Sequence, residues 1–431
     1  MKKVAGSVFF MSTLFATGVL ATNGDNMIGV SPASRAMGGL GTGICLEPTD
    51  SIFRNPGWLA RQRGFNLSFG GILFMPHVKG RSKGFWDTDD NNRTAGITPI
   101  DSGYKTSDAD TFTIPEIAIT NQINDHVVVG IGAYGVSGMG VDYRSNDNLN
   151  KMHTSLQFMR IVPAIGYKFN ERLSVGGALH FAWGALDLGG IMAYDNDGDG
   201  VPGTTWNAGG GQSQSYGIGA SIGINYKPTN DICLGAYYQS GVKMKYSNVF
   251  DSNNDGNFED LKLEQPQEVS VGIGFRPIEE LKVGFDIRWI NWSDADGYKQ
   301  FDWKDQWVFA IGGEYKVTAR LALRTGYNYG KSPIRNGNNL NATNRTNTIP
   351  NFDGRFSDYD VQWFNLIGFP AITEHHLTFG FGYQFTENFT FNVSYVHAFE
   401  KKVESTAFDG ALLAGAKNSQ DSVGVSLDWH F

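Results

Sequence analysis

The last segment of the chain constrains its fold more than any other feature. From Val423 to Phe431, Val, Val, Leu, Trp and Phe alternate with Gly, Ser, Asp and His. A period of two predicts a β-strand with one apolar and one polar face. A final strand of this kind, closing the chain on an aromatic residue, is typical of bacterial outer-membrane β-barrels. The alternative is the last strand of a soluble β-sandwich.

The first residues have the composition of a secretory signal peptide. Lys2 and Lys3 precede an apolar run that extends to Ala21, where small residues fit a cleavage site. We therefore expect a signal peptide at residues 1–21 and a mature chain that begins at Thr22. An uncleaved anchor helix is the alternative, although the run is short for a membrane span. No later segment approaches ~18 uninterrupted apolar residues, which argues against membrane-spanning helices.

Many other segments alternate in the same way. There are about fourteen such segments in all, of which Phe65–Met75 is the first. Short turns and long loops alternate between them. This pattern predicts an all-β fold in which residues 63–431 form a transmembrane antiparallel β-barrel of about fourteen strands. Residues 22–62 do not alternate and contain many apolar side chains, so we expect them to form an N-terminal hatch or plug in the lumen. A disordered periplasmic tail is the alternative.

The composition argues against several classes of function. With 35 Lys and Arg against 43 Asp and Glu, the net charge of −8 makes nucleic acid an unsuitable partner. The chain has no Gly-x-Ser-x-Gly elbow, phosphate loop or Cys-x-x-Cys motif, so we expect no enzymatic activity. Cys45 and Cys233 are far apart in sequence, and a periplasmic route would permit a disulfide between them. The sequence leaves that question open.

Charged residues recur on the strand faces opposite to the apolar ones. At membrane depth such residues must face water or one another, so we expect them in the lumen. Three of them, Arg160, Arg288 and Arg324, are candidates for binding a carboxylate ligand, because a guanidinium group matches carboxylate geometry. The alternative for each is an interior ion-pair network that stabilises the barrel.

Several motifs occur in order along the mature chain. They are Ser-Arg-Ala-Met-Gly-Gly at 34–39, Asp50 followed by Asn55-Pro56, and the segments 286–292 and 369–380. Together they resemble the outer-membrane long-chain fatty acid transporter family of the FadL/TodX type. The resemblance implies a monomeric fourteen-stranded barrel with hydrophobic ligands bound near the hatch. It assigns ligand binding or gating to these hatch residues: Arg35, Phe53, Asn55, Pro56, Trp58 and Leu59.

The resemblance also implies that a kink in the third strand opens the barrel wall sideways into the bilayer. Glycines inside a strand mark bulges or bends. The third strand here ends in a run that fits such a kink, formed by Gly135, Ser137, Gly138 and Gly140. A glycine-rich strand end that runs into its loop is the alternative. Gly57 stands where the family has Ala, which loosens the hatch element without abolishing it.

The outer loops do not resemble the apolar helical hairpins that form the family's low-affinity groove. One apolar outer stretch could take the place of that groove, because an exposed apolar surface loop often marks a ligand-binding site. Packing of this stretch into the barrel mouth is the alternative to ligand capture. The stretch contains Trp363, Phe364, Leu366, Ile367 and Phe369.

Two Asp-rich loops follow the opening of a calcium-binding loop, with oxygen ligands at alternate positions and then Gly. The candidate ligands are Asp195, Asp197 and Asp199 in the first loop, and Asp251, Asn253, Asp255 and Glu259 in the second. Where such a loop ends in Glu, this chain has Trp206 and Lys262. Exposed turns without metal are the alternative, because Asp, Asn and Gly form turns readily. We expect no other cofactor.

These observations predict a passive transporter in the outer membrane of a Gram-negative bacterium. The expected cargo is long-chain fatty acids or other hydrophobic compounds, admitted by the hatch and released laterally through the kinked third strand. The alternatives are an aromatic hydrocarbon channel of the same family and a structural or adhesion barrel with calcium-ordered loops. Outer-membrane lipid and the barrel assembly machinery are expected partners, the latter through the C-terminal strand ending in Phe431.

Overall fold

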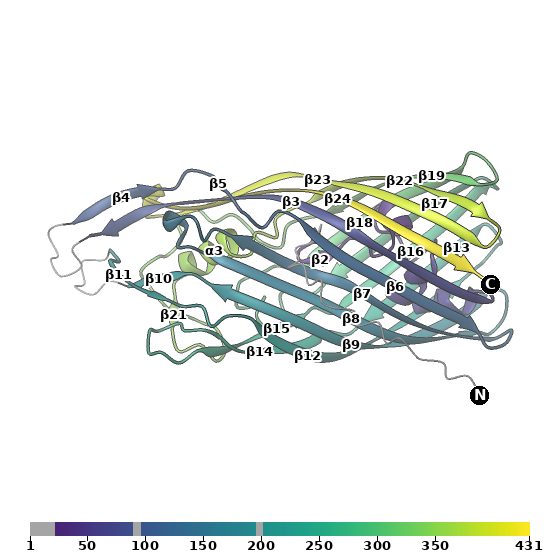
Figure 1. Cartoon of the computed structure of the whole chain (residues 1–431), viewed down its shortest axis with the longest axis horizontal. Coiled ribbons are helices and arrows are strands. Elements are labelled where there is room, and N and C mark those ends of the chain that lie inside the picture. The colour runs from purple at the N-terminus through teal and green to yellow at the C-terminus, as the bar shows by residue number, and fades with distance from the viewer. Residues whose placement is uncertain (1–21, 89–95, 195–200) are drawn as a thin grey trace, which may run out of the picture.

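Fourteen antiparallel strands close into one barrel within residues 22–88, 96–194 and 201–431, the part of the chain that the computed structural model describes (Figure 1). The predicted all-β barrel is thereby confirmed. The last wall strand pairs with the first, from Leu413 opposite Lys83 to His430 opposite Asn66. This pairing joins the first and last strands of the sheet to each other. The wall strands are β3 (Phe65–Asp87), β6 (Phe112–Gln122), β7 (Val127–Asp142), β8 (His153–Lys168), β9 (Leu173–Gly189), β12 (Ser213–Tyr226), β13 (Ile232–Gln239), β16 (Glu268–Ile278), β17 (Leu281–Ile290), β18 (Gln306–Lys316), β19 (Leu321–Gly330), β22 (His375–Thr386), β23 (Phe389–Ala407) and β24 (Leu412–His430).

The two ends of the barrel differ. Short turns join the strands at one end, on the right of Figure 1, and long excursions join them at the other. Hairpins and short helices build up the long excursions. These outer elements are β4 (Ile97–Asp101), β5 (Lys105–Thr106), η2 (Asp147–Leu149), β10 (Ile191–Tyr194), β11 (Thr204–Asn207), β14 (Val242–Phe250), β15 (Glu259–Gln265), β20 (Asn347–Thr348), β21 (Arg355–Phe356), α3 (Asp358–Ile367) and η3 (Phe408–Gly410).

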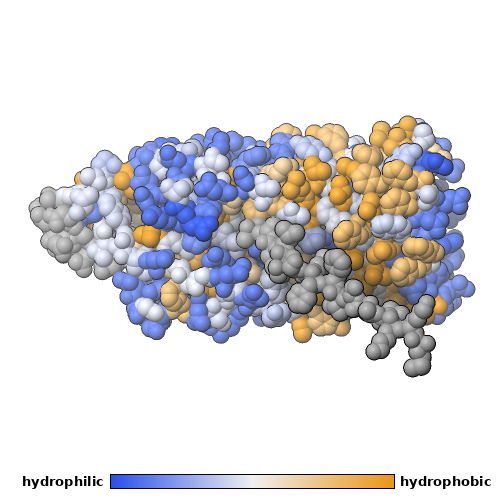
Figure 2. Space-filling model, in the orientation of Figure 1, coloured by the Kyte–Doolittle hydropathy of each residue, from blue (hydrophilic) through white to orange (hydrophobic). Residues whose placement is uncertain are grey.

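The surface is divided along the barrel axis. Around the turn end, outward-facing side chains are large and apolar, for example Phe69, Ile218 and Trp307. Figure 2 shows this hydrophobic surface and the hydrophilic surface of the outer half. An apolar belt of this kind is what a bilayer requires of a barrel wall. Among the described residues, no helix combines the length and the apolar character needed to cross a membrane.

The segment from Thr22 to Gln62 lies inside the barrel. Its residues from Thr22 to Leu59 are almost all buried. The predicted signal peptide, residues 1–21, lies outside the described part of the chain. The elements of the segment are β1 (Thr22–Asn23), β2 (Asn26–Met27), α1 (Pro32–Ala36), α2 (Pro48–Phe53) and η1 (Pro56–Arg61).

Candidate functional site

The segment from Thr22 to Gln62, here called the hatch, lies so close to the wall that some strands need glycine at the contact. A Cβ atom on Gly235 of β13 would lie 1.8 Å from the carbonyl oxygen of Thr42. One on Gly176 of β9 would lie 2.0 Å from that of Pro56. Only glycine allows this approach of two backbones. Neither position stands out in the sequence, because glycine is frequent everywhere in the chain, which has 55.

Asp286 of β17 anchors the loop between α1 and α2 of the hatch. Its Oδ2 accepts hydrogen bonds from the backbone N–H groups of Gly41 (2.9 Å) and Thr42 (2.8 Å). Its Oδ1 accepts a third from the Gly43 N–H at 3.0 Å. Hydrogen bonds to an ionised group are stronger than neutral ones. One wall carboxylate therefore fixes three consecutive hatch residues, a role that the sequence motif around Asp286 did not reveal.

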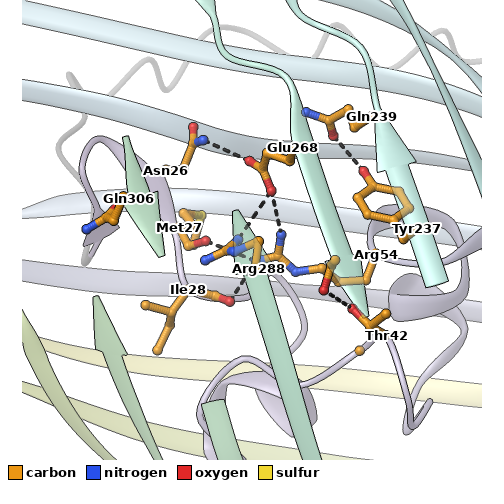
Figure 3. Close-up of polar contacts among 12 residues, drawn as sticks. Asn26, Met27, Ile28, Thr42, Arg54, Tyr237, Gln239, Glu268, Arg288 and Gln306 are labelled. Carbon is orange, nitrogen blue, oxygen red and sulfur yellow. Dashed lines mark hydrogen bonds and ion pairs between the residues drawn. The ribbon is translucent and has the colours of Figure 1, made fainter. Parts of the chain in front are cut away.

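A second wall carboxylate, Glu268 of β16, joins a hatch arginine to a wall arginine (Figure 3). Its Oε2 lies 3.5 Å from Nη1 of Arg54 in the hatch and 3.5 Å from Nη1 of Arg288 in β17. Its Oε1 accepts a hydrogen bond from the Asn26 side chain at 2.9 Å. Removing one member of such a buried group leaves an uncompensated charge, which is strongly destabilising. Arg54 and Glu268 were not predicted from the sequence, because nothing in the local pattern distinguishes them from other charged residues.

Asn55 both caps a helix and ties the hatch to the wall. Its Oδ1 accepts the Gly57 N–H at 2.9 Å, as an N-cap side chain does for η1. Its Nδ2 donates to the carbonyl oxygens of Thr42 (3.0 Å) and Ile224 (3.2 Å). The Trp58 indole N–H donates to the same Thr42 carbonyl at 3.1 Å. The amide of Asn55 in the Asn-Pro element therefore makes both the helix cap and the contact with the wall.

Arg35 is fully buried in α1 and bonds to both the hatch and the wall. Its Nη1 donates to the Gly29 carbonyl at 3.0 Å, and its Nη2 donates to Ser422 Oγ of β24 at 2.6 Å. No carboxylate forms an ion pair with it among the described residues. Its guanidinium therefore acts here as a hydrogen-bond donor that holds α1 against the last strand.

Phe53, Pro56 and Leu59 contribute apolar contacts at the hatch–wall boundary. The Phe53 ring packs edge-on against Tyr134 of β7, with ring centroids 5.3 Å apart. Leu59 is fully buried in the same apolar cluster. Pro56 opens η1, where its missing N–H costs no hydrogen bond. All the predicted hatch residues thus lie at the boundary, and their role in ligand binding or gating remains a prediction.

Four carboxyl groups gather where the hatch meets β6 and β24. Glu47 and Asp50 belong to the hatch, and Glu116 and Asp428 to the wall; all four are buried. Ser426 Oγ lies 3.1 Å from Glu47 Oε1 and 3.2 Å from Asp428 Oδ2. Burial raises the pKa of Asp50 to about 7 and, with repulsion from Asp428, raises that of Glu47 well above its usual value. Protonation of the hatch carboxyls therefore favours the docked hatch.

Two of the three predicted lumen arginines have the interior ion pairs that the alternative interpretation expected. Arg288 shares Glu268 with Arg54, as described above. Arg324 Nε donates to Glu314 Oε2 at 2.7 Å, and its Nη1 donates to Asn392 Oδ1 at 2.6 Å. Both guanidinium groups are therefore committed to partners within the wall in this conformation.

Arg160 differs from the other two. Its Nη1 donates to Gln239 Oε1 and lies 3.2 Å from His180 Nδ1. Among the described residues it forms no ion pair with a carboxylate, and its Nε has no hydrogen-bond partner. A buried guanidinium without a counter-ion is costly. Of the three arginines, Arg160 is the one best placed to receive a carboxylate from outside the chain.

The third wall strand, β7, carries a bulge inside the predicted run. Gly135 and Ser137 pair with consecutive residues of β8, so Val136 is the extra residue. The strand then continues through Gly138 and Gly140 to Asp142 rather than ending in a loop. A bulge bends its strand and increases the local twist. The predicted irregularity is present, and lateral opening at this place remains a prediction.

The hatch occupies the edge of β7 just beyond this bulge. Pairing between β6 and β7 ends at Tyr134. Beyond it, Asn26 of β2 pairs with Ser137. The Gly138 N–H donates to the Asp25 carbonyl at 3.2 Å. Where two wall strands part, the first residues of the hatch therefore close the gap.

The predicted apolar outer stretch forms helix α3 and the turn after it, and it packs into the barrel mouth. Ser357 caps α3, accepting the Asp360 N–H at 3.1 Å. The Trp363 indole N–H donates to Ser82 Oγ of β3 at 3.0 Å. Packing into the mouth, rather than exposure for ligand capture, is what the structure shows. The rest of the stretch is buried or half-buried: Phe364, Leu366, Ile367 and Phe369.

The Asp-rich loop after β14 is organised by its own backbone. Asp251 accepts hydrogen bonds from three N–H groups of the loop, and Asp255 accepts one from the Asn253 side chain at 3.1 Å. Both Glu259 oxygens accept bonds from Ser252. Within the described ranges, no three His, Cys, Asp or Glu side chains converge to hold a metal ion. The first candidate loop lies outside those ranges: Asp195, Asp197 and Asp199.

The two cysteines are not bridged. The Cys45 thiol donates to the Glu47 carbonyl at 3.3 Å, and the Cys233 thiol donates to Asn225 Oδ1 at 3.1 Å. Each thiol is thus satisfied by its own neighbourhood. The question that the sequence left open is answered for this conformation, and the hatch is tied to the wall by non-covalent contacts.

The docked hatch leaves little free space at its contact with the wall. A cavity of about 10 Å³ lies there, bounded in part by Thr42, Arg54, Asp286 and Arg288. This volume suits about one water molecule, whereas ligand pockets measure about 300–1,000 Å³. This cavity is therefore too small to hold a fatty acid or an aromatic hydrocarbon.

Comparison with known proteins places this geometry in a family. The model of the outer membrane protein transport proteins (OMPP1/FadL/TodX) matches residues 14–359. The long-chain fatty acid transport protein of Escherichia coli is 22% identical over 423 residues, covering 86% of this chain and 85% of that protein. A putative outer membrane protein of Neisseria meningitidis is 21% identical over 436 residues, with coverage of 87% and 85%.

Solved structures show the same fold. A FadL homologue of Pseudomonas aeruginosa has a TM-score of 0.71 at 16% identity, covering 95% of this chain and all (100%) of that one. The toluene transporter TodX of Pseudomonas putida has a TM-score of 0.67 at 20% identity, with coverage of 94% and 99%. The family model covers most of the chain, residues 14–359 of 431. This chain belongs to the OMPP1/FadL/TodX family of outer membrane transport proteins.

Proposed function

We propose that the chain is a passive channel through which long-chain fatty acids or other hydrophobic compounds cross the outer membrane. Two relatives support a hydrophobic cargo, namely the E. coli long-chain fatty acid transport protein and the P. putida toluene transporter. The observation that carries the proposal is a hatch docked inside the barrel, whose apolar side chains, such as Phe53 and Leu59, are part of a large buried apolar cluster. Catalysis and a cofactor have no part in it.

Aromatic side chains stand where such a cargo would first meet the hatch. Trp292 packs against Tyr298 and Trp303, with ring centroids 4.7 Å and 5.1 Å away. Gly24 lies directly against the Trp292 ring, which a Cβ atom would approach to 2.5 Å. The Tyr298 hydroxyl donates to the Asp25 carboxylate. A solute that displaces these rings would therefore disturb the first residues of the hatch.

The same hatch residues support lateral release. Asp25 and Asn26 close the gap beside β7, so their withdrawal would leave unpaired backbone groups of β7 next to a break in the wall. At this edge the hatch contributes two backbone contacts, together with the side-chain hydrogen bonds of Asp25 to Tyr298 and of Asn26 to Glu268, whereas separating β7 from β8 would break a full ladder. We propose that cargo leaves the lumen through this gap.

The choice between fatty acid and hydrocarbon depends on the head group. A fatty acid brings a carboxylate, and Arg160 is the one of the three predicted lumen arginines that forms no ion pair with a carboxylate among the described residues. An aromatic hydrocarbon has no such group and would gain nothing from Arg160. Replacement of Arg160 by Gln should therefore weaken oleate uptake several-fold and leave toluene uptake unchanged. Equal effects on both solutes would refute a head-group role for Arg160.

The proposal as a whole is tested by uptake of labelled oleate in cells that lack their own transporter and express this chain. Replacing Asn55 and Pro56 by Ala should change uptake, since it removes the cap and two wall contacts of the hatch. Heat-modifiable migration of the barrel in gels checks assembly. An assembled wild-type barrel that transports neither oleate nor toluene would refute a hydrophobic cargo.

A structural or adhesion barrel with calcium-ordered loops is the second candidate, favoured by the Asp251–Glu259 loop. It predicts calcium-dependent binding to a surface partner and no flux of apolar solutes. We further propose that the chain works as a monomer in outer-membrane lipid. The barrel assembly machinery would recognise its C-terminal strand ending in Phe431, so replacing Phe431 by Ala should lower the assembled fraction.

A further inference from the structure

Three lysines stand side by side on the outside of the barrel wall. Lys79 of β3 is paired with Lys417 of β24, and Lys417 is paired in turn with Lys402 of β23. Paired residues of adjacent strands point to the same face of the sheet. Ala416 and Asn418, on either side of Lys417, are buried. The lysine row therefore faces away from the lumen.

The row is unfavourable for the barrel alone, because like charges directly opposite one another destabilise a sheet. Lys402 Nζ lies 2.8 Å from Glu404 Oε2, and Lys417 Nζ lies 3.6 Å from Glu400 Oε1. Lys79 forms no ion pair within the part of the chain that the structure describes. Positive charge is thus left unbalanced here in a chain whose net charge is −8.

Tyr104, in the connection between β4 and β5, orders two of the ammonium groups. Its ring centroid lies 5.7 Å from Lys402 Nζ and 5.0 Å from Lys417 Nζ, within cation–π distance. Its hydroxyl donates to Glu404 Oε1 at 2.8 Å. Side chains that are ordered before a ligand binds lose less entropy on binding. The row is therefore preorganised on one flank.

The height of the row matches the head-group layer of the outer leaflet. Outward residues of β3 are apolar or Gly from Phe65 to Met75, and Lys79 follows four positions later. At about 3.3 Å per residue and a tilt of about 40°, the apolar stretch spans about 25 Å of the membrane normal. By the same measure Lys79 lies about 10 Å beyond it. Figure 2 shows the corresponding change from hydrophobic to hydrophilic surface.

We propose that Lys79, Lys402 and Lys417 bind the phosphate groups of lipopolysaccharide, the phosphorylated glycolipid of the outer leaflet. One phosphate accepts hydrogen bonds from several ammonium groups and offsets their repulsion. Basic clusters at head-group height bind anionic lipids in this way. A membrane lipid is the expected occupant because exposed apolar residues, Leu73 and Val423, lie below the row on the same strands, where acyl chains run.

The test measures binding of purified lipopolysaccharide to the full-length barrel in a non-ionic detergent. Replacing Lys79, Lys402 and Lys417 together by Gln should weaken binding by about tenfold or more, since each charge near a head-group layer contributes. The same three positions changed to Arg should retain binding. Lipopolysaccharide stripped of its phosphates should bind the wild-type barrel as weakly as the Gln variant binds the intact lipid.

A matched control removes three positive charges at the turn end. Lys168 and Arg276 are ion-paired, like two members of the row, and Lys316 completes the set. Their replacement by Gln should leave binding unchanged. Equal weakening in both triple variants, unaltered binding in the first, or full competition by inorganic phosphate would overturn the proposal. If the first triple variant does not assemble, the single variant Lys79→Gln tests the proposal instead, because it breaks no ion pair. Undiminished binding of lipopolysaccharide to that variant would also overturn the proposal.

Discussion

Replacing Asp286 by Ala should release the hatch loop from the wall while the barrel stays intact. The carboxylate accepts three backbone hydrogen bonds at 2.8–3.0 Å, from Gly41, Thr42 and Gly43. A hydrogen bond to a charged group contributes about 1.5–3 kcal/mol, so three of them amount to about 4.5–9 kcal/mol if they add. Because they share one carboxylate they do not add fully, and we expect about 4 kcal/mol. That is about a thousandfold change in the docking equilibrium.

Hydrogen exchange measures this equilibrium at the amides concerned. In the Asp286→Ala barrel, protection of the amides at 41–43 should fall by about three orders of magnitude, while wall-strand amides keep theirs. Asp286→Asn should be intermediate, since its oxygen still accepts but its NH₂ faces a donor. The control is Glu314→Gln, which removes a buried wall carboxylate that bonds to Lys282 and Arg324. Unchanged protection at 41–43, or an equal loss in the control, would refute the anchor.

Three further changes test the hatch and the mouth. Gly235→Ala should prevent close docking, because its Cβ would lie 1.8 Å from the Thr42 oxygen, and proteolysis should then cleave the hatch. Burial raises the pKa of Asp50 to about 7, so docking is strongest below about pH 4 and weakens as the pH rises through 7. The protection of hatch amides against hydrogen exchange, relative to the unprotected rate at each pH, should therefore fall from pH 5 to 8. The fall should be smaller in Asp50→Asn. Ser357→Ala should cost α3 about 1 kcal/mol, detected as faster exchange in α3 alone.

Alternation alone was sufficient to predict the barrel, because a wall strand faces lipid on one side and the lumen on the other along its whole membrane span. It was less informative beyond the membrane. The first strand alternates visibly from Phe65 to Met75, whereas β3 continues to Asp87. Outside the bilayer the outward residues are polar, such as Lys79 and Arg81, so the apolar signal stops although pairing with β24 continues.

The alternation of side chains was enough to predict which strand faces meet lipid, and the family motifs marked the hatch and the irregular third strand. Which buried groups contact one another became visible only in the folded chain. Gly41 and Asp286 are 245 positions apart, and Asn26 and Glu268 are 242 apart. The physical reason is that facing lipid is a property of each strand separately. A contact between hatch and wall depends instead on how all the strands close around the segment that fills them.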